Sequence, residues 1–263
     1  MNRSIEQLLP GQIQEIARKS GVVFIPVSPM FEWHSYHLPG GVDGLIAEAV
    51  SSRLAERFGA AWFRVLSLGM DDVRDDNFKQ TQGIDPSEYV FGMNYPALPL
   101  RSEYAEADDL RRLVGARLRT AIAAGFRYVF VINHHGGCGQ MDTLIRTANE
   151  CQTDTCRIEV LQTVTFNRYS PPPGSEFYLK VGGHAGLAET IQFMAFYPDA
   201  ADMTQLPEGP LRASETGILH DRPDIAAEFN PRQADPAIAD AWGRCLLDSM
   251  EAHIRQRIKT GQK

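Results

Sequence analysis

The sequence lacks the features that would indicate a nucleic-acid-binding, membrane or secreted protein. Acidic residues outnumber basic ones, 33 to 26, which gives a formal charge of −7 and leaves no basic footprint for nucleic acid or an anionic membrane. The longest apolar runs are as short as a β-strand, which excludes a membrane-spanning helix. The first residues have no apolar core of a signal peptide. We therefore expect neither a nucleic-acid nor a membrane partner.

Cysteine pairs, nucleotide-binding glycines and repeats are also missing. The four cysteines show no CxxC spacing and are too sparse for a disulfide framework, so the cytoplasm is the expected compartment. No GxGxxG follows the first predicted strand, which argues against a Rossmann-like nucleotide binder. No repeat of 20–50 residues and no low-complexity linker divides the chain. We expect residues 1–263 to form one domain.

The hydrophobic pattern predicts strands that alternate with helices. Apolar runs of strand length are bounded by turn formers, and longer segments have helical spacing. The predicted strands are 22–27, 62–68, 127–132 and 157–163, and the predicted helices are 4–19, 44–58, 105–124, 140–151, about 184–196 and 236–258. The segments 70–104, 164–182 and 198–235 show no clear period. This order predicts an α/β fold with a mainly parallel sheet.

Polar side chains gather at three strand–helix junctions. Glu32, His34, His37 and Asp43 follow the first strand, between the apolar run 22–27 and the next predicted helix. Asn133-His134-His135-Gly136-Gly137 follows the strand 127–132, and His184 with Glu189 opens a later helix. The carboxyl ends of parallel strands open on one edge of a sheet, so these loops are expected to converge. Histidine and carboxylate ligands together suit Zn²⁺, Mn²⁺ or Fe²⁺.

Each residue also has a plainer explanation on its own. Asp43, just before a predicted helix, would serve equally well as its N-cap. His37 could hydrogen-bond a turn, His184 could cap its helix, and Glu189 could face water. The coincidence of three such clusters at equivalent positions favours a site.

The three segments resemble, in order, the motifs of the creatininase (creatinine amidohydrolase) family. The family has Glu-x-His-Gly-Pro-His-Leu-Pro with a later Asp, then Asn-Gly-His-Gly-Gly-Asn, then His-Ala-Gly-x-x-Glu-Thr. The corresponding stretches here are 32–39 with Asp43, 133–138, and 184–190. The resemblance covers about residues 20–195.

The resemblance implies a three-layer α/β/α fold and two divalent metal ions per subunit (Zn, Mn or Fe). Asp43 would bridge the ions, Glu32 and His135 would complete one shell, and His34 and Glu189 the other. Creatininase has a glutamate at the position of Gly137, so Glu189 is our substitute for that ligand.

By the same resemblance, His184 would be the acid–base group. His37 would act beside it, as a substrate contact or a support of the ligands. A small-molecule substrate and a homo-oligomer, possibly a hexamer, are also expected.

Several residues differ from the family pattern around the expected pocket. Ser35-Tyr36 replaces Gly-Pro, His134 replaces a glycine, and Cys138 replaces an asparagine. We therefore expect a substrate different from that of the best-known members. His134, Tyr36, Asn94 and Tyr95 are the predicted substrate-binding residues. Arg101, Asn167, Arg168 and Tyr169 are further candidates in the irregular segments.

The expected reaction is hydrolysis of a cyclic amide by a metal-activated water, with His184 protonating the departing nitrogen. The same chemistry would serve hydrolytic ring opening of a keto-cyclitol, in which a C–C bond breaks. A metal-binding assembly subunit without turnover is the second alternative.

Overall fold

The computed structural model describes residues 4–168, 171–179 and 182–261. Five strands form one parallel sheet, with the order β2-β1-β4-β5, and β3 also pairs with β1. The strands are β1 (Val22–Ser28), β2 (Ala61–Trp62), β3 (Leu66–Ser67), β4 (Tyr128–Asn133) and β5 (Arg157–Gln162). The mainly parallel α/β fold predicted from the sequence is confirmed.

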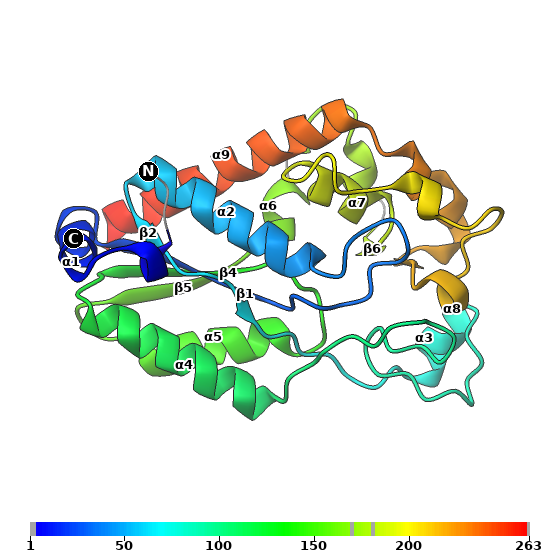
Figure 1. Cartoon of the computed structure of the whole chain (residues 1–263), viewed down its shortest axis with the longest axis horizontal. Coiled ribbons are helices and arrows are strands. Elements are labelled where there is room, and N and C mark those ends of the chain that lie inside the picture. Colours follow the sequence, from blue (N-terminus) through cyan, green and yellow to red (C-terminus); the bar gives the residue numbers. More distant parts are fainter. Residues whose placement is uncertain (1–3, 169–170, 180–181, 262–263) are drawn as a thin grey trace.

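Helices cover both faces of the sheet, which makes three layers (Figure 1). α2 (Val42–Phe58), α7 (Leu187–Met194) and α9 (Pro236–Thr260) lie on one face, and α4 (Ala107–Ala123) and α5 (Gln140–Cys151) lie on the other. Alternate residues of β1 enter the two cores: Phe24 packs with the α2 and α9 layer, and Ile25 with the α4 layer. Burial on both faces explains why β1 and β4 are continuous apolar runs.

The structure divides the predicted strand 62–68 into two short strands, β2 and β3. Two carboxylates that are distant in the sequence bind the backbone between them. The backbone N–H of Arg64 donates to the carboxylate of Glu6, and that of Val65 donates to the carboxylate of Glu48. These groups are therefore lost to pairing with β1 between β2 and β3.

The predicted helix 4–19 is also divided. A short 3₁₀ turn, Ile5–Gln7, precedes α1 (Pro10–Lys19), which begins at its proline. Proline lacks the N–H that a helix interior needs but fits the first helical position.

The segments without a clear period contain short elements. α3 (Asp76–Thr81) lies within 70–104, where the sequence predicted no helix. α6 (Thr163–Arg168) begins at the last residue of the predicted strand 157–163 and continues into 164–182, which also contains a 3₁₀ turn, Glu176–Leu179. β6 (Gly183–His184) pairs antiparallel with β7 (Leu219–His220). The remaining elements are Met203–Gln205, α8 (Ala213–Thr216), Pro223–Phe229 and Pro231–Gln233. None of the helices within the described ranges is long and apolar enough to cross a membrane.

Candidate metal centre

His34 presents one nitrogen to three carboxylates. Its Nδ1 lies 3.0 Å from the backbone carbonyl of Glu32, which makes Nδ1–H the donor and leaves Nε2 to face the carboxylates. That Nε2 is buried, and among the described residues it has no hydrogen-bond partner. It lies 3.6 Å from Asp43 Oδ1, 3.8 Å from Glu189 Oε1 and 4.0 Å from Glu32 Oε2. These separations are too long for hydrogen bonds and leave room for a cation between the groups.

The second imidazole, His135, contacts two of the same carboxylates. Its Nδ1 is 2.8 Å from Asp43 Oδ2 and 3.2 Å from Glu32 Oε2. Its Nε2 is 2.8 Å from the carbonyl of Met70, a contact that fixes the orientation of the ring.

Asp43 lies inside α2 and is not its N-cap. The helix begins at Val42 and its N-cap is Gly41, two residues earlier than the N-cap interpretation of Asp43 requires. Asp43 is 2% exposed, and its two oxygens face different histidines. The alternative of an N-cap is therefore wrong, because the side chain points into the centre and not along the helix end.

Glu189 and His184 come from the junction of β6 and α7. Glu189 Oε2 accepts a hydrogen bond from the backbone N–H of Ala185 at 2.5 Å, so the carboxylate also ties the start of its helix. His184 Nε2 is 2.5 Å from the carbonyl of Trp33, and its Nδ1 is 3.8 Å from Glu189 Oε2. The N-cap of α7 is Gly186, so His184 does not cap the helix.

Burial and charge work against each other in this cluster. Burial alone would lower the pKa of His34, but the carboxylates of Glu189, Asp43 and Glu32 raise it to about 10. Burial would raise the pKa of Asp43, yet His135 and His34 hold it well below its usual value. The pKa of His135 is raised well above its usual value for the same reason, with Glu32 and Asp43 outweighing burial. Without a metal ion, the cluster is a buried network of charged partners.

Among the described residues, three groups of donor atoms are close enough together to hold a cation. They are Glu32, Asp43 and His135; His34, Asp43 and Glu189; and Glu32, His34 and His184. The first two share only Asp43 and place one histidine in each. His34 Nε2, in the second group, is buried without a hydrogen-bond partner among the described residues, and Glu32 Oε2, in the first, is buried with only the His135 ion pair at 3.2 Å, so each group has a buried donor atom that a cation would satisfy. The residues therefore fit a pair of metal ions.

Tyr104 supports this centre although the sequence motifs do not include it. Its hydroxyl donates to Glu32 Oε1 at 2.6 Å and accepts from the backbone N–H of Met93 at 2.9 Å. Burial and the nearby Glu32 carboxylate raise the pKa of Tyr104, so the hydroxyl keeps its proton. The only sequence signal was its place in the aromatic and polar segment 70–104.

A cavity of about 570 Å³ opens next to these residues. Its inner wall includes Glu32, Asp43, His135, His184 and Glu189. Its outer wall comes from α3 and its neighbours and from β7, and includes Arg74, Asp75, Phe78, Gln82 and His220. The amide of Gln82 donates to the carbonyl of His220 and links these two parts of the outer wall. His220 lay outside the three motifs and reaches the cavity only through the pairing of β6 with β7.

Six predicted residues do not line this cavity. One is His34, which lies in the metal centre behind it, and the others are His37, His134, Tyr36, Asn94 and Tyr95. His37 is buried, and its Nε2 is 2.9 Å from the hydroxyl of Thr190. Because that hydroxyl donates to the carbonyl of Gly186, His37 is the donor and ties its loop to α7. Burial and the neighbouring His34 lower the pKa of His37 to about 4. The contacts suit a supporting role better than a substrate contact.

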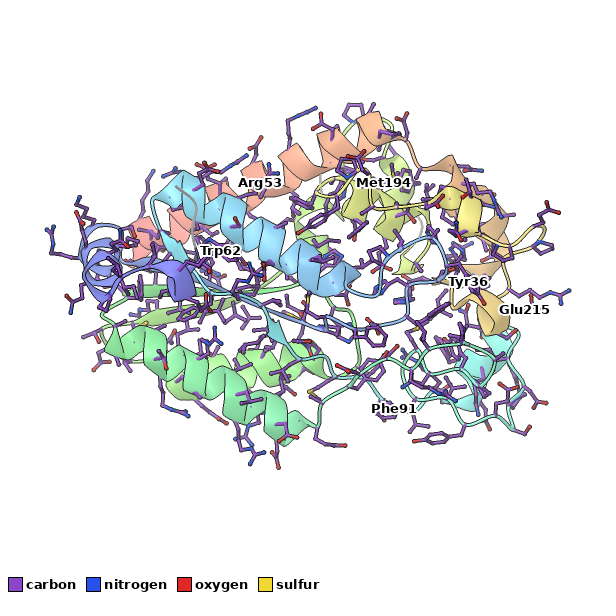
Figure 2. The ribbon with its side chains drawn as sticks, viewed as in Figure 1. Tyr36, Arg53, Trp62, Phe91, Met194 and Glu215 are labelled. Carbon is purple, nitrogen blue, oxygen red and sulfur yellow. The ribbon has the colours of Figure 1, made fainter. Side chains whose placement is uncertain are left out.

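The other four have structural partners. His134 Nδ1 is 2.5 Å from the hydroxyl of Thr163, and the ring is buried. Tyr95 is also buried, with its hydroxyl 3.8 Å from the sulfur of Met93. Asn94 holds the backbone of Ser102 through both atoms of its amide. Tyr36 is exposed and lies beside Glu215 at the edge of the molecule (Figure 2).

Of the further candidates, Arg101 donates to the carbonyls of Asn94 and Tyr95 and does not line the cavity. Tyr169 lies outside the described residues, and the side chains of Asn167 and Arg168 are not described.

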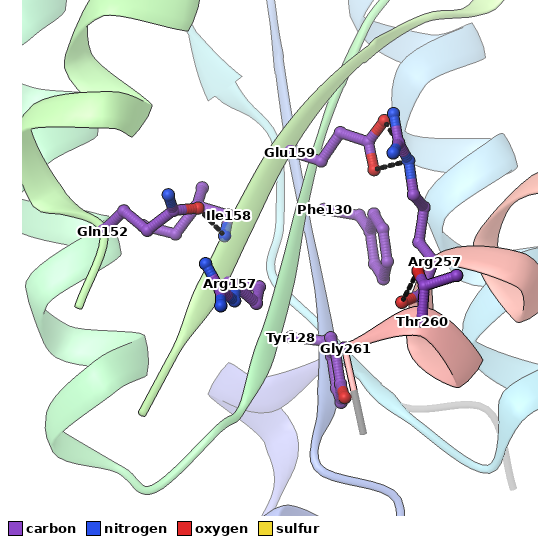
Figure 3. A pocket seen from close by; sticks show the side chains of 9 residues that line it. All are labelled: Tyr128, Phe130, Gln152, Arg157, Ile158, Glu159, Arg257, Thr260 and Gly261. Atoms are coloured by element: carbon purple, nitrogen blue, oxygen red, sulfur yellow. Dashed lines mark hydrogen bonds and ion pairs between the residues drawn. The ribbon is translucent and has the colours of Figure 1, made fainter. Parts of the chain in front are cut away.

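A second cavity, of about 360 Å³, lies between β5 and the end of α9 (Figure 3). Its Glu159 carboxylate accepts from Arg257 at 3.2 Å and lies 2.8 Å from His253. These two contacts fasten α9 to β5. This cavity contains none of the candidate metal-binding groups found among the described residues.

Fold and site define an α/β protein with a candidate metal centre at the carboxyl ends of its parallel strands, and the sequence comparison identifies its family. Residues 104–258 match the family model named Creatininase: creatinine amidohydrolase. The chain belongs to the creatininase family. The matched range contains His135, His184 and Glu189, while the segment with Glu32, His34 and Asp43 lies before it. No curated protein sequence matches the chain significantly.

Solved structures resemble the chain over nearly its whole length. A structure named creatininase Mn has a TM-score of 0.69 and 19% identity, over 97% of this chain and 99% of that one. A mutant creatininase of Zn–Zn type has a TM-score of 0.66 and 18% identity, over 97% and 98%. A creatinine amidohydrolase (creatininase) has a TM-score of 0.68 and 18% identity, over 96% of each chain. These likenesses establish the creatininase fold.

Proposed function

We propose that the chain is a divalent-metal-dependent hydrolase that opens a cyclic amide or a related small carbonyl substrate by breaking a C–N bond. The observation that carries the proposal is His34 Nε2, a buried ring nitrogen that faces three carboxylates and has no hydrogen-bond partner in the described part of the chain. Membership of the creatininase family supports the reaction type.

Two sets of residues would each hold one cation. Glu32, Asp43 and His135 would hold the first, and His34, Asp43 and Glu189 the second, with Asp43 shared between them. When bound, the ions would supply an activated water and a polarised carbonyl. Tyr104 would keep Glu32 oriented, and the Met70 carbonyl would do the same for His135.

His184 would handle the proton. Its Nε2 is engaged with the carbonyl of Trp33, which leaves Nδ1 as the nitrogen that can exchange a proton with a group in the cavity. The Glu189 carboxylate lies 3.8 Å from that Nδ1. A protonated His184 can deliver its proton to a departing nitrogen.

Elemental analysis of the purified protein and of a Glu189→Gln variant tests the proposal. We expect two equivalents of Zn, Mn or Fe per chain in the wild type and one in the variant. Glu208→Gln, at an exposed position, is the matched control and should retain both. A protein that takes up no divalent metal after reconstitution would contradict the proposed hydrolase. Two equivalents in Glu189→Gln would instead move the second site to another ligand, such as His184.

A further inference from the structure

The outer wall of the cavity contains a guanidinium group to which neither the family motifs nor the metal centre gives a role. Arg74 lies in the segment between β3 and α3 and lines the cavity together with Asp71, Asp75 and Phe78. Its side chain is 20% exposed. It is the only arginine or lysine among the described residues that line this cavity.

One edge of the guanidinium is held by the protein. Nε donates to the carbonyl of Gly92 at 3.2 Å, and Nη2 donates to Asp71 Oδ2 at 2.6 Å. The group also lies over the ring of Phe78, 5.0 Å from its centroid. These three contacts fix the plane of the guanidinium before any ligand arrives, so little rotamer entropy remains to be lost on binding.

The anchor of Arg74 is itself fixed to the metal-binding turn. Asp71 is 2% exposed in its side chain, and its Oδ1 accepts from the backbone N–H groups of Asp72 and Cys138, at 2.8 and 3.3 Å. Cys138 lies three residues after His135, and the carbonyl of Met70, next to Asp71, bonds the His135 ring. Arg74 is therefore held in a constant position relative to the candidate metal centre.

The other edge of the guanidinium is unused. Nη1 has no hydrogen-bond partner among the described residues, and the second hydrogen of Nη2 is likewise available. Together they form a two-pronged donor whose geometry matches the two oxygens of a carboxylate. A residue whose sole function was to neutralise Asp71 would not need to border the cavity.

The charges of the remaining cavity residues allow an anion at this position. Asp71 is neutralised by Arg74, and Glu32, Asp43 and Glu189 would be balanced by the bound cations. Asp75 Oδ1 accepts from the backbone N–H of Phe78 at the start of α3. Asp75 and Asp221 still give the outer wall a negative character. Affinity for an anion would therefore come from direct contact with the guanidinium and not from the overall field.

We propose that Arg74 binds a carboxylate of the substrate, at the end of the molecule away from the bond that is cleaved. The substrate class is then a small cyclic amide that carries a carboxylate. The proposal rests on the proposed hydrolase function for the position of the cleaved bond, but binding can be measured without turnover.

Matched pairs of cyclic amides test the proposal. We would titrate the metal-loaded protein calorimetrically with 5-oxoproline and 2-pyrrolidinone, and with dihydroorotate and dihydrouracil, which differ in the carboxylate. In at least one pair, we expect the compound that carries the carboxylate to bind the wild-type protein about 10- to 100-fold more tightly than the neutral compound. Arg74→Gln should remove that preference, and Arg74→Lys should restore only part of it, because lysine lacks the fork.

Arg101→Gln is the matched control. Arg101 lies in the same irregular segment and also donates to backbone carbonyls, but it does not line the cavity. Its replacement should leave the preference intact. Metal content and melting temperature are measured for each variant, so that loss of fold is not mistaken for loss of recognition.

The proposal is overturned if neither carboxylate binds detectably, if the neutral partners bind as tightly, or if the preference survives in a folded, metal-loaded Arg74→Gln protein. A preference that depends on Arg74 without any hydrolysis would support the recognition site and count against the proposed reaction. Hydrolysis of the neutral amides alone would support the proposed reaction and count against the recognition site.

Discussion

Asp43 Oδ1 lies 3.6 Å from His34 Nε2, a contact between a carboxylate near the start of α2 and an imidazole of the preceding loop. The other oxygen of Asp43 lies 2.8 Å from His135 Nδ1, from the turn after β4. One carboxylate thus joins the two halves of the centre. The proposed ligand sets meet only at this residue, which makes it the most informative position to change.

Asp43→Asn should lose both metal ions and hydrolytic activity. The amide keeps the size of the side chain but cannot supply two anionic oxygens, so both proposed sites lose a ligand. Elemental analysis and turnover are the measurements. Asp240→Asn, an exposed change on α9, is the control and should alter neither. Full metal content and turnover in Asp43→Asn would show that the bridging assignment is wrong.

His184→Asn separates two roles for that histidine. If His184 carries the proton, its replacement should lower turnover about 10²- to 10⁴-fold and leave both metal ions bound. As a ligand of the alternative group with Glu32 and His34, it should cost one metal ion as well. His253→Asn, at the Glu159 contact, controls for the loss of an imidazole elsewhere. Unchanged turnover would remove His184 from the mechanism.

The stability of the metal-free protein should depend on pH through His34. Burial works against the charged ring, but the carboxylates of Glu189, Asp43 and Glu32 raise its folded-state pKa from 6.5 to about 10. A raised pKa means that this stabilisation is fully present below pH 6.5 and is lost as the pH rises through 10. The pKa of Asp43 is shifted downward, so its contribution is present above its usual pKa of 3.8 and is lost in acid.

The measurement is the melting temperature of metal-free wild type and metal-free His34→Gln between pH 6 and 10. Other groups that titrate near pH 10 affect both proteins and cancel in the difference. We expect the wild type to be the more stable at pH 6 and the difference to shrink as the pH rises. A difference that stays constant would mean that the folded-state pKa of His34 is not raised.

Much of the fold followed from local pattern. β1 and β4 are buried on both faces, so each was visible as an apolar run, and α5 was predicted with its observed bounds because its helical spacing is regular. The break between β2 and β3 was not predictable in this way. It depends on carboxylates from Glu6 and Glu48, which are distant from it in the sequence.

The site shows the same division. The residues proposed as ligands stand at strand–helix junctions, where the topology of a parallel sheet brings them together. The outer wall depends on contacts that the sequence does not reveal, such as the pairing that brings His220 beside Gly183. Asn94 was predicted to bind substrate because it is polar and lies in an irregular segment. Its amide instead holds the backbone of Ser102.

Ser35→Gly should stabilise the protein by about 1 kcal/mol. Ser35 has a φ of 65°, a left-handed conformation that costs a residue with a Cβ about 1–2 kcal/mol. Glycine removes that strain, although its freer unfolded chain offsets about 0.5–1 kcal/mol. The buried Ser35 hydroxyl, which has no hydrogen-bond partner among the described residues, adds to the gain when it is removed.

Denaturant unfolding of Ser35→Gly and Ser35→Ala measures the two contributions. Alanine removes the hydroxyl but keeps the strained backbone, so it should be less stable than glycine. Equal stability of the two variants would mean that the backbone conformation costs little.

Gly137→Ala should damage the metal centre, whereas Gly136→Ala should not. A Cβ at Gly137 would lie 2.0 Å from the carbonyl oxygen of Met70 and 2.1 Å from His135 Nε2, separations that no relaxed structure tolerates. The carbonyl is backbone, so the His135 ring must give way and lose its bond to Met70. We expect a loss of about 1–3 kcal/mol in stability and weaker metal binding. A Cβ at Gly136 would meet nothing within 4 Å.

The two variants add the same methyl group at neighbouring positions, so their comparison isolates the contact with His135. Denaturant unfolding gives the stability, and titration of the metal-free proteins with Zn²⁺ or Mn²⁺ gives the affinity. The crowding also explains why glycine stands at this position, because the His135–Met70 contact occupies the space that a larger side chain would need. Equal metal affinity in Gly137→Ala and Gly136→Ala would show that this contact does not hold the ligand in place.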